Sequence, residues 1–198
     1  VNSVTTATTT LSGATTATSV TLTQGILNTN GVACSWGSFS SNNANTRTLT
    51  LGASSVTVTG TGTVWDMGGG GTLTVSANTS TLIISDATAV AKTFNGGGIT
   101  TYKDITFSGD NITVTGSNTF ATMFVQNAAL PNGLILTTGT TQTITNLKTN
   151  GFALNLAIIK SSGAGQAILT KALDSISVDF MAITDITTAG ITQWYAGT

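Results

Sequence analysis

Threonine alternates with apolar residues along most of this chain, and this pattern limits the folds that the chain can adopt. Runs such as Thr48–Leu51, Val56–Thr59, Thr72–Val75 and Ile112–Thr115 place an apolar side chain at every second position. Successive side chains of a β-strand point to opposite faces, so each run predicts a strand with one buried and one solvated face. Threonine, which accounts for 44 of 198 residues, is β-branched and suits strands better than helices. The sequence therefore predicts an all-β protein.

Glycine, asparagine and serine separate the apolar runs, as turns separate strands. The predicted strands are Ser19–Thr23, Thr48–Leu51, Ser55–Thr59, Thr72–Val75, Thr81–Ile84, Ile105–Phe107, Ile112–Thr115, Leu134–Thr137, Gln142–Thr145, Leu154–Ile159, Ala167–Thr170 and Ile176–Phe180. The best helix candidate is Asp86–Phe94. Residues 1–18 are low in complexity and are predicted to be a leader or a capping strand. Residues 19–198 are predicted to form a single β-solenoid domain. A fragment of a longer chain is an alternative interpretation of this domain.

Two all-β architectures fit these strands: a parallel β-solenoid, and an antiparallel β-sandwich or jelly roll. In a solenoid the chain winds in coils, and each coil adds one strand to each of several parallel sheets. The similar triplets at Thr48 and Thr72 begin 24 residues apart, with three eight-residue units between them. This spacing predicts one three-sided coil over Thr48–Gly71. The inward side chains of that coil would be Leu49, Leu51, Val56, Val58, Val64 and Trp65.

Four Asn-Gly dipeptides are typical of two-residue hairpins and favour the antiparallel alternative. They are Asn30-Gly31, Asn95-Gly96, Asn132-Gly133 and Asn150-Gly151. Asparagine also tolerates the left-handed backbone conformation, so the same residues suit the corners of a solenoid. The coil spacing makes the β-solenoid the favoured prediction.

The composition excludes several function classes. Charged residues make up 7% of the chain, and the net charge is −1. Binding of nucleic acid or of an anionic membrane surface needs clustered basic residues, so neither is predicted. The chain has no His and a single Cys, which excludes Ser-His-Asp and Cys-His catalysis and zinc sites of the His/Cys type within this chain. Cys34 is predicted to be a buried apolar residue.

No catalytic, cofactor-binding or metal-binding residue is predicted, and the chain is not expected to be an enzyme. The glycine runs at 68–71 and 96–98 lack the Lys-Ser/Thr ending of a phosphate-binding loop. Paired Asp residues are the one catalytic alternative, because glycoside hydrolysis uses two carboxyl groups. Asp104 and Asp110 flank one strand, and Asp174, Asp179 and Asp185 cluster near the end. A role in turns and caps is the favoured interpretation of these residues.

Aromatic residues are the candidate contacts to a partner or to a glycan. Trp and Tyr rings can stack on sugar rings, although they more often belong to a core. Apolar segments at Phe120–Val125 and Ile191–Tyr195 are predicted to meet a second copy of the chain. The candidate contact residues are Trp36, Phe120, Phe124, Trp194 and Tyr195. Ice binding by a Thr-x-Thr grid is a further alternative, which the unequal gaps between such pairs disfavour.

Several segments resemble the right-handed β-helix repeat regions of phage structural proteins and of large secreted prokaryotic surface proteins. The matching segments are Arg47–Trp65, Ala91–Gly98, Gly116–Phe120, Thr138–Thr143, Ser177–Phe180, Ile183–Asp185 and Trp194–Gly197. The resemblance implies a β-solenoid fold and a location on a virion, outside the cell or on a cell surface. It brings no catalytic residues.

These observations together predict a non-catalytic structural or adhesive module of a virion, such as a fibre, spike or decoration protein. A repeat module of a secreted bacterial adhesin and a polysaccharide-degrading β-helix enzyme remain alternatives. The expected partners are further copies of the chain or other virion or surface proteins, with a glycan as a further candidate. No cofactor is expected.

Overall fold

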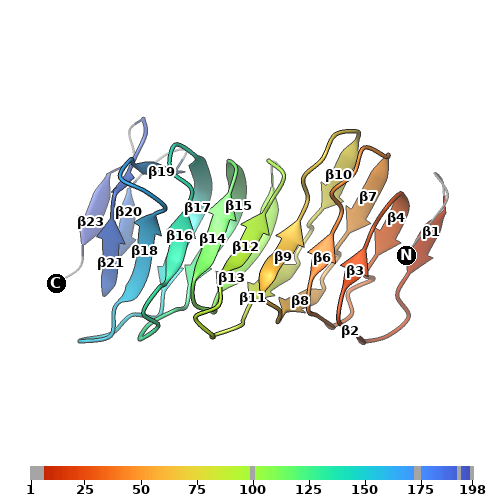
Figure 1. The fold of residues 1–198 in the computed structure, drawn as a ribbon, viewed down its shortest axis with the longest axis horizontal. Coiled ribbons are helices and arrows are strands. Elements are labelled where there is room, and N and C mark those ends of the chain that lie inside the picture. Colours follow the sequence, from red (N-terminus) through yellow and green to blue (C-terminus); the bar gives the residue numbers. More distant parts are fainter. Residues whose placement is uncertain (1–6, 99–100, 172–174, 191–192, 197–198) are drawn as a thin grey trace.

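A computed structural model describes residues 7–98, 101–171, 175–190 and 193–196 of the chain. Figure 1 shows an elongated molecule in which the strands stack one after another along the long axis, from the N-terminal to the C-terminal end. The described residues form 23 strands and no helix. Every pairing between these strands is parallel, so the molecule is a parallel β-solenoid of about seven turns. This confirms the predicted fold class and excludes the antiparallel sandwich.

The strands form three long sheets and one short sheet. Sheet A contains β1 (Thr8–Thr10), β4 (Gly25–Asn28), β7 (Arg47–Thr50) and β10 (Leu73–Ser76). Sheet B contains β2 (Thr15–Ala17), β5 (Cys34–Trp36), β8 (Ser55–Val58), β11 (Thr81–Ile84), β13 (Tyr102–Phe107), β15 (Asn118–Val125), β17 (Thr141–Thr149), β19 (Ala167–Lys171) and β22 (Ile186–Thr187). Sheet C contains β3 (Val20–Thr21), β6 (Phe39–Ser40), β9 (Gly62–Asp66), β12 (Lys92–Asn95), β14 (Ile112–Thr115), β16 (Leu134–Leu136), β18 (Ala157–Ser161) and β21 (Met181–Thr184). The short sheet pairs β20 (Ile176–Val178) with β23 (Trp194–Ala196).

The long strand β17, which pairs with β15 along one side, changes its neighbour on the other side along its length. The second half of β15 continues the row of β11 and β13, with Met123 beside Ile105. The first half of β17 instead pairs with β19, with Thr141 beside Ile168. The second half of β17 has β20 as its neighbour. Sheet B therefore divides at β17, and this division positions the groove described below.

The coil that the sequence predicts over Thr48–Gly71 is two residues too short. Thr48 pairs with Thr74, a step of 26 residues rather than 24. Coil length also varies, from 18 residues between Thr8 and Ile26 to 30 between Gly62 and Lys92. The six predicted inward residues of that coil are nevertheless all buried. Leu49, Leu51, Val56 and Val58 are correct because alternation within a strand does not depend on the coil length. The adjacent Val64 and Trp65 are both buried because β9 has an irregularity in its register with β12.

Left-handed residues form the corner between sheets A and B in three successive coils. Asn30, Gly52 and Asn78 have φ values of 54°, 58° and 48°. In each coil a turn hydrogen bond closes this corner, as from the Val32 amide to the Thr29 carbonyl at 3.1 Å. Asn30-Gly31 is thus a solenoid corner and not a hairpin. The only antiparallel bridge among the described residues is a small one between Phe152 and Asn155.

An aromatic stack fills the middle of the interior. Phe39 lies 4.6 Å from Trp65 between ring centroids, and Trp65 lies 6.3 Å from Phe94. Trp36 and Phe120 belong to the same stack and are buried. Their burial corrects the prediction that they contact a partner or a glycan, because neither side chain has an accessible face. Cys34 is buried as predicted, and burial raises the pKa of its thiol.

Arg47 holds together two neighbouring loops at the other end of sheet A. Its buried guanidinium donates to the carbonyl oxygens of Ser41 at 2.9 Å, Gly68 at 3.1 Å and Gly70 at 3.1 Å. Gly71 must be glycine here, because a Cβ atom would lie 2.0 Å from the Ala44 carbonyl oxygen. The glycine run at 68–71 is therefore a close-packed corner that a buried cation stabilises.

Candidate functional site

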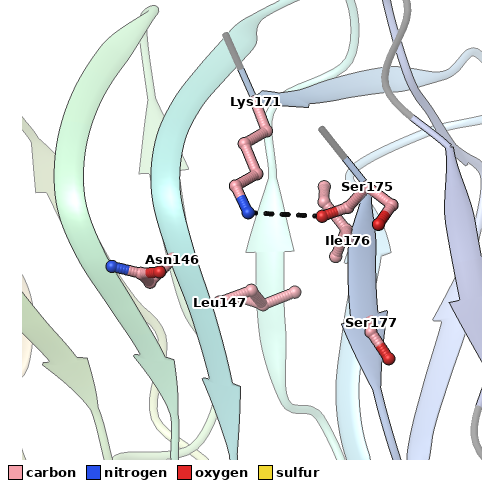
Figure 2. A pocket seen from close by; sticks show the side chains of 6 residues that line it. All are labelled: Asn146, Leu147, Lys171, Ser175, Ile176 and Ser177. Carbon is pink, nitrogen blue, oxygen red and sulfur yellow. Dashed lines mark hydrogen bonds between the residues drawn. The ribbon is translucent and has the colours of Figure 1, made fainter. Parts of the chain in front are cut away.

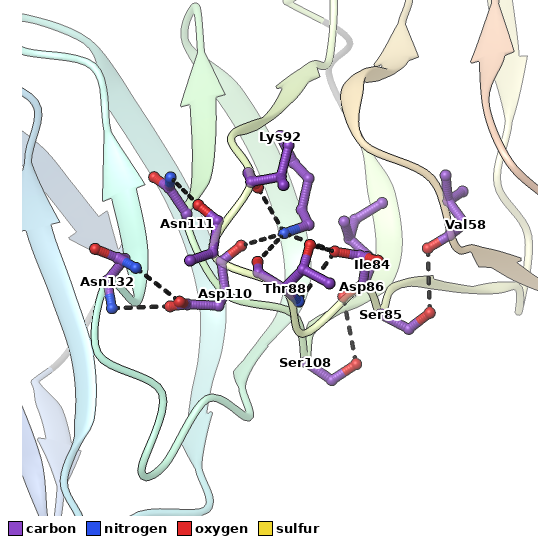
Figure 3. A network of polar contacts seen from close by, with 12 residues as sticks. Val58, Ile84, Ser85, Asp86, Thr88, Lys92, Ser108, Asp110, Asn111 and Asn132 are labelled. Carbon is purple, nitrogen blue, oxygen red and sulfur yellow. Dashed lines mark hydrogen bonds and ion pairs between the residues drawn. The ribbon is translucent and has the colours of Figure 1, made fainter.

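Several of the charged side chains are used inside the fold, as the cluster around Lys92 illustrates (Figure 3). The Lys92 ammonium is fully buried and lies 2.9 Å from an Asp86 carboxylate oxygen. It also donates to the carbonyl oxygens of Val90 at 2.7 Å and Asp110 at 2.8 Å. These bonds fold residues 86–91 into a loop, so the helix predicted over Asp86–Phe94 is wrong. A buried ammonium needs several hydrogen-bond acceptors. The carbonyl oxygens of a loop are free to accept from Lys92, whereas those of a helix accept from the backbone amides of the helix.

Asp110 performs the turn role that the sequence predicts for the Asp residues. One carboxylate oxygen accepts from the backbone amides of Asn132 and Gly133, each at 2.8 Å, and the other accepts from the Asn132 side chain at 2.8 Å. Burial acts to raise the pKa of Asp110, but these hydrogen bonds outweigh it and hold the pKa below its usual value. Asp110 thereby links two successive coils.

The structure predicts that the protein loses stability in acid. A carboxylate with a lowered pKa stabilises the fold above its unfolded pKa, near 4, and this contribution is lost as the pH falls through its folded value. Asp86 acts in the same direction, because hydrogen bonds from Thr88 and Lys92 lower its pKa. We expect the free energy of unfolding to fall as the pH drops below about 4. Urea titrations at several pH values would measure it, and an Asp110→Asn variant should show a shallower acid slope than wild type.

The remaining predicted Asp residues within the described part of the chain lie on different strands and loops. Asp179 and Asp185 are exposed, Asp104 lies on β13, and Asp174 lies outside the described residues. Asp66 binds Asn42 at 2.8 Å and Asn95 at 2.9 Å, which joins three successive coils. Within the described ranges, no three His, Cys, Asp or Glu side chains gather as a metal site requires.

The candidate binding site is a groove on sheet B where β17 and β20 run side by side. We call it the β17–β20 groove. Cα atoms of the two strands approach within 8 Å, yet no ladder of backbone hydrogen bonds joins them among the described residues. Two hollows of about 250 and 470 Å³ follow this line and share Leu147 and Ser177. The groove arises because β19 pairs with β17 only along the first half of β17.

The first hollow has a polar rim (Figure 2). Lys171, at the end of β19, extends between the strands, and its ammonium lies 3.4 Å from the Ser175 carbonyl oxygen. Asn146 on β17 and Ser177 on β20 border the same hollow, and Leu147 lies between them. This part of the groove therefore offers both donors and acceptors at the surface.

The second hollow combines two aromatic rings with two opposite charges. Phe124 and Lys148 lie on adjacent strands as register partners and face outward. Asp179 and Phe180 border the hollow from the segment that follows β20. Phe180 exposes 43% of its surface and has a φ of 51°, which is rare for a bulky residue. Its carbonyl oxygen accepts from the Ala157 amide at 3.0 Å, which fixes the backbone at this point.

Two of the five aromatic residues predicted as contacts lie on this outer face. Phe124 borders the groove, and Tyr195, exposed on β23, is the register partner of Ser177. Trp194 is half-buried against the core, and Ile191 lies outside the described residues. Phe180 and Lys148 were missed in the sequence. The signal for Phe180 in the sequence is weak. Phe180 continues the alternation of the apolar residues Ile176 and Val178, but it directly follows the polar Asp179.

A second exposed feature is the apolar loop between β17 and β18, which extends beyond the strand ends in Figure 1. Phe152, Leu154 and Leu156 are exposed there, and Leu154 is 99% accessible. The strand predicted over Leu154–Ile159 begins only at Ala157. Phe152, Leu154 and Leu156 are out of phase with the buried Ala157 and Ile159, so one strand could not bury both sets.

Comparisons with known protein families, with curated proteins and with solved structures found no match to this chain. The fold alone defines its class, which is that of the parallel β-solenoid proteins. The described residues contain no helix long and apolar enough to cross a membrane.

Proposed function

We propose that the protein is a non-catalytic structural and adhesive module of a virion, such as a fibre, spike or decoration protein. A secreted bacterial surface adhesin of the same architecture is the near alternative. The observation that carries the proposal is the use of charge within the fold. Arg47, Lys92 and Asp110 are buried and bind backbone groups of neighbouring coils. Charges placed in this way stabilise a rod and are withdrawn from any reaction.

Association with further copies of the chain is the second part of the proposal. Phe152, Leu154 and Leu156 expose apolar surface on one projecting loop, and such patches mark contacts between proteins. Leu154 is held outward in a left-handed conformation with φ of 70°, between reciprocal hydrogen bonds that join Phe152 and Asn155. A bulky residue in this conformation is strained, and such strain concentrates at functional positions.

Light scattering tests the assembly proposal. The chain has a mass of 19.9 kDa, and we expect the wild-type particle to be a multiple of it. Leu154→Asp should shift the particle toward the monomer without changing the melting temperature, because the side chain makes few contacts within its own chain. Thr145→Asp, at another exposed site, is the control and should leave the mass unchanged. A wild-type protein that stays monomeric at high concentration contradicts the proposal.

A further inference from the structure

The β17–β20 groove carries a combination of groups that selects one chemical class of ligand. Phe180 and Phe124 offer apolar aromatic surface, while Lys148 can donate hydrogen bonds and Asp179 can accept them. Thr149 and Ser177 add hydroxyl groups that do both. A sugar ring presents an apolar C–H face and a rim of hydroxyl groups, so it matches an aromatic surface flanked by donors and acceptors.

The dimensions of the groove disfavour an extended peptide. A peptide strand inserted between β17 and β20 would need two interstrand spacings, roughly 9.6 Å in all. The two strands already approach within 8 Å, so an added strand does not fit between them. The groove is also long, because Asn146–Thr149 spans roughly 10 Å at the usual rise of a β-strand. A ligand that lies along the surface suits this shape better than one inserted end-on.

Phe180 is the residue whose exposure and backbone conformation most clearly indicate contact with a ligand. The phenyl ring of Phe180 is 43% exposed, and an apolar ring gains little free energy from contact with water. The backbone conformation of Phe180 is also strained. The Ala157 amide and the close approach of Gly151 fix that backbone, since a Cβ atom on Gly151 would lie 1.8 Å from the Phe180 carbonyl oxygen. The surrounding chain thus maintains a costly arrangement that holds the ring at the groove.

We propose that the β17–β20 groove binds a saccharide chain. Phe180 stacks on a sugar face, Lys148 donates to sugar oxygens and Asp179 accepts from sugar hydroxyls. This inference deepens the adhesive part of the proposed function and rests on it.

An array of neutral and carboxylated oligosaccharides tests the proposal, followed by calorimetric titration of the strongest binder. We expect Phe180→Ala to weaken binding about tenfold, the equivalent of a lost aromatic contact. Lys148→Met, at an exposed position that tolerates substitution, should weaken the same binding. The matched control is Val90→Ala, which removes another exposed apolar side chain outside the groove and outside the loop of Phe152, Leu154 and Leu156, and should leave the affinity unchanged.

Two results would overturn the inference. One is an array on which no oligosaccharide binds, or on which only a control panel of acidic peptides binds. The other is equal loss of affinity in Val90→Ala and Phe180→Ala while both variants melt as the wild type does. A particle mass that still shows association would then leave the assembly proposal standing, so the two failures can be distinguished.

Discussion

Replacing Lys92 with alanine is expected to destabilise the protein by about 3–5 kcal/mol, the range for removing one member of a buried ion pair. The substitution leaves the Val90 and Asp110 carbonyl oxygens without their donor and removes the partner of Asp86. These groups sit between successive coils, so the loss weakens the connection of one coil to the next. Urea unfolding followed by circular dichroism measures the change.

Two further variants separate charge from volume in this cluster. Lys92→Met keeps most of the side-chain stem but provides no donor, so it should be nearly as unstable as Lys92→Ala. Lys148→Ala removes an exposed lysine and should stay within about 0.5 kcal/mol of the wild type. A Lys92→Met protein as stable as the wild type would show that the buried hydrogen bonds contribute little.

Trp65→Ala is expected to cost about 3–5 kcal/mol, as large aromatic deletions in cores do. Trp65 is fully buried and stacks between Phe39 and Phe94. Its indole N–H also donates to the Tyr102 hydroxyl at 3.1 Å, and that hydroxyl donates to the Gly96 carbonyl oxygen at 3.0 Å. The deletion therefore opens a cavity and disconnects a buried polar chain.

Tyr102→Phe is the matched control for this polar chain. It keeps the aromatic ring but leaves the Trp65 N–H and the Gly96 carbonyl without a partner, which should cost about 1–3 kcal/mol. Urea unfolding measures both variants. Equal losses in Trp65→Ala and Tyr102→Phe would contradict the assignment of the larger effect to packing.

The sequence predicts the fold class and the buried faces well, because both depend on the alternation of neighbouring residues. Leu49, Val56 and Val64 are placed correctly although the coil length is wrong by two residues. Coil length depends on loops such as 86–91, and the conformation of that loop follows from Lys92 and Asp110, which are 18 residues apart. Local pattern carries no information about a bond of that separation.

The sequence also does not show which of the aromatic residues in β15 point inward and which point outward. Phe120 and Phe124 are four residues apart and would share a face in a regular strand. In β15 the burial alternation breaks at Ala121 and Thr122, so Phe120 points inward and Phe124 outward. The sequence does not predict the groove either, because the groove depends on which strand lies beside β17. That neighbour is set by the chain between residues 150 and 175, where β18 and β19 intervene.

We propose that this solenoid binds and supports but does not catalyse, and a turnover assay is the most direct test of this proposal. Capsular and host polysaccharides would be incubated with saturating protein, and new reducing ends and chain length measured over days. We expect no change beyond that in a protein-free control. Steady release of reducing ends, abolished by Asp179→Asn and retained in Asp185→Asn, would contradict it and make the protein a polysaccharide-degrading enzyme.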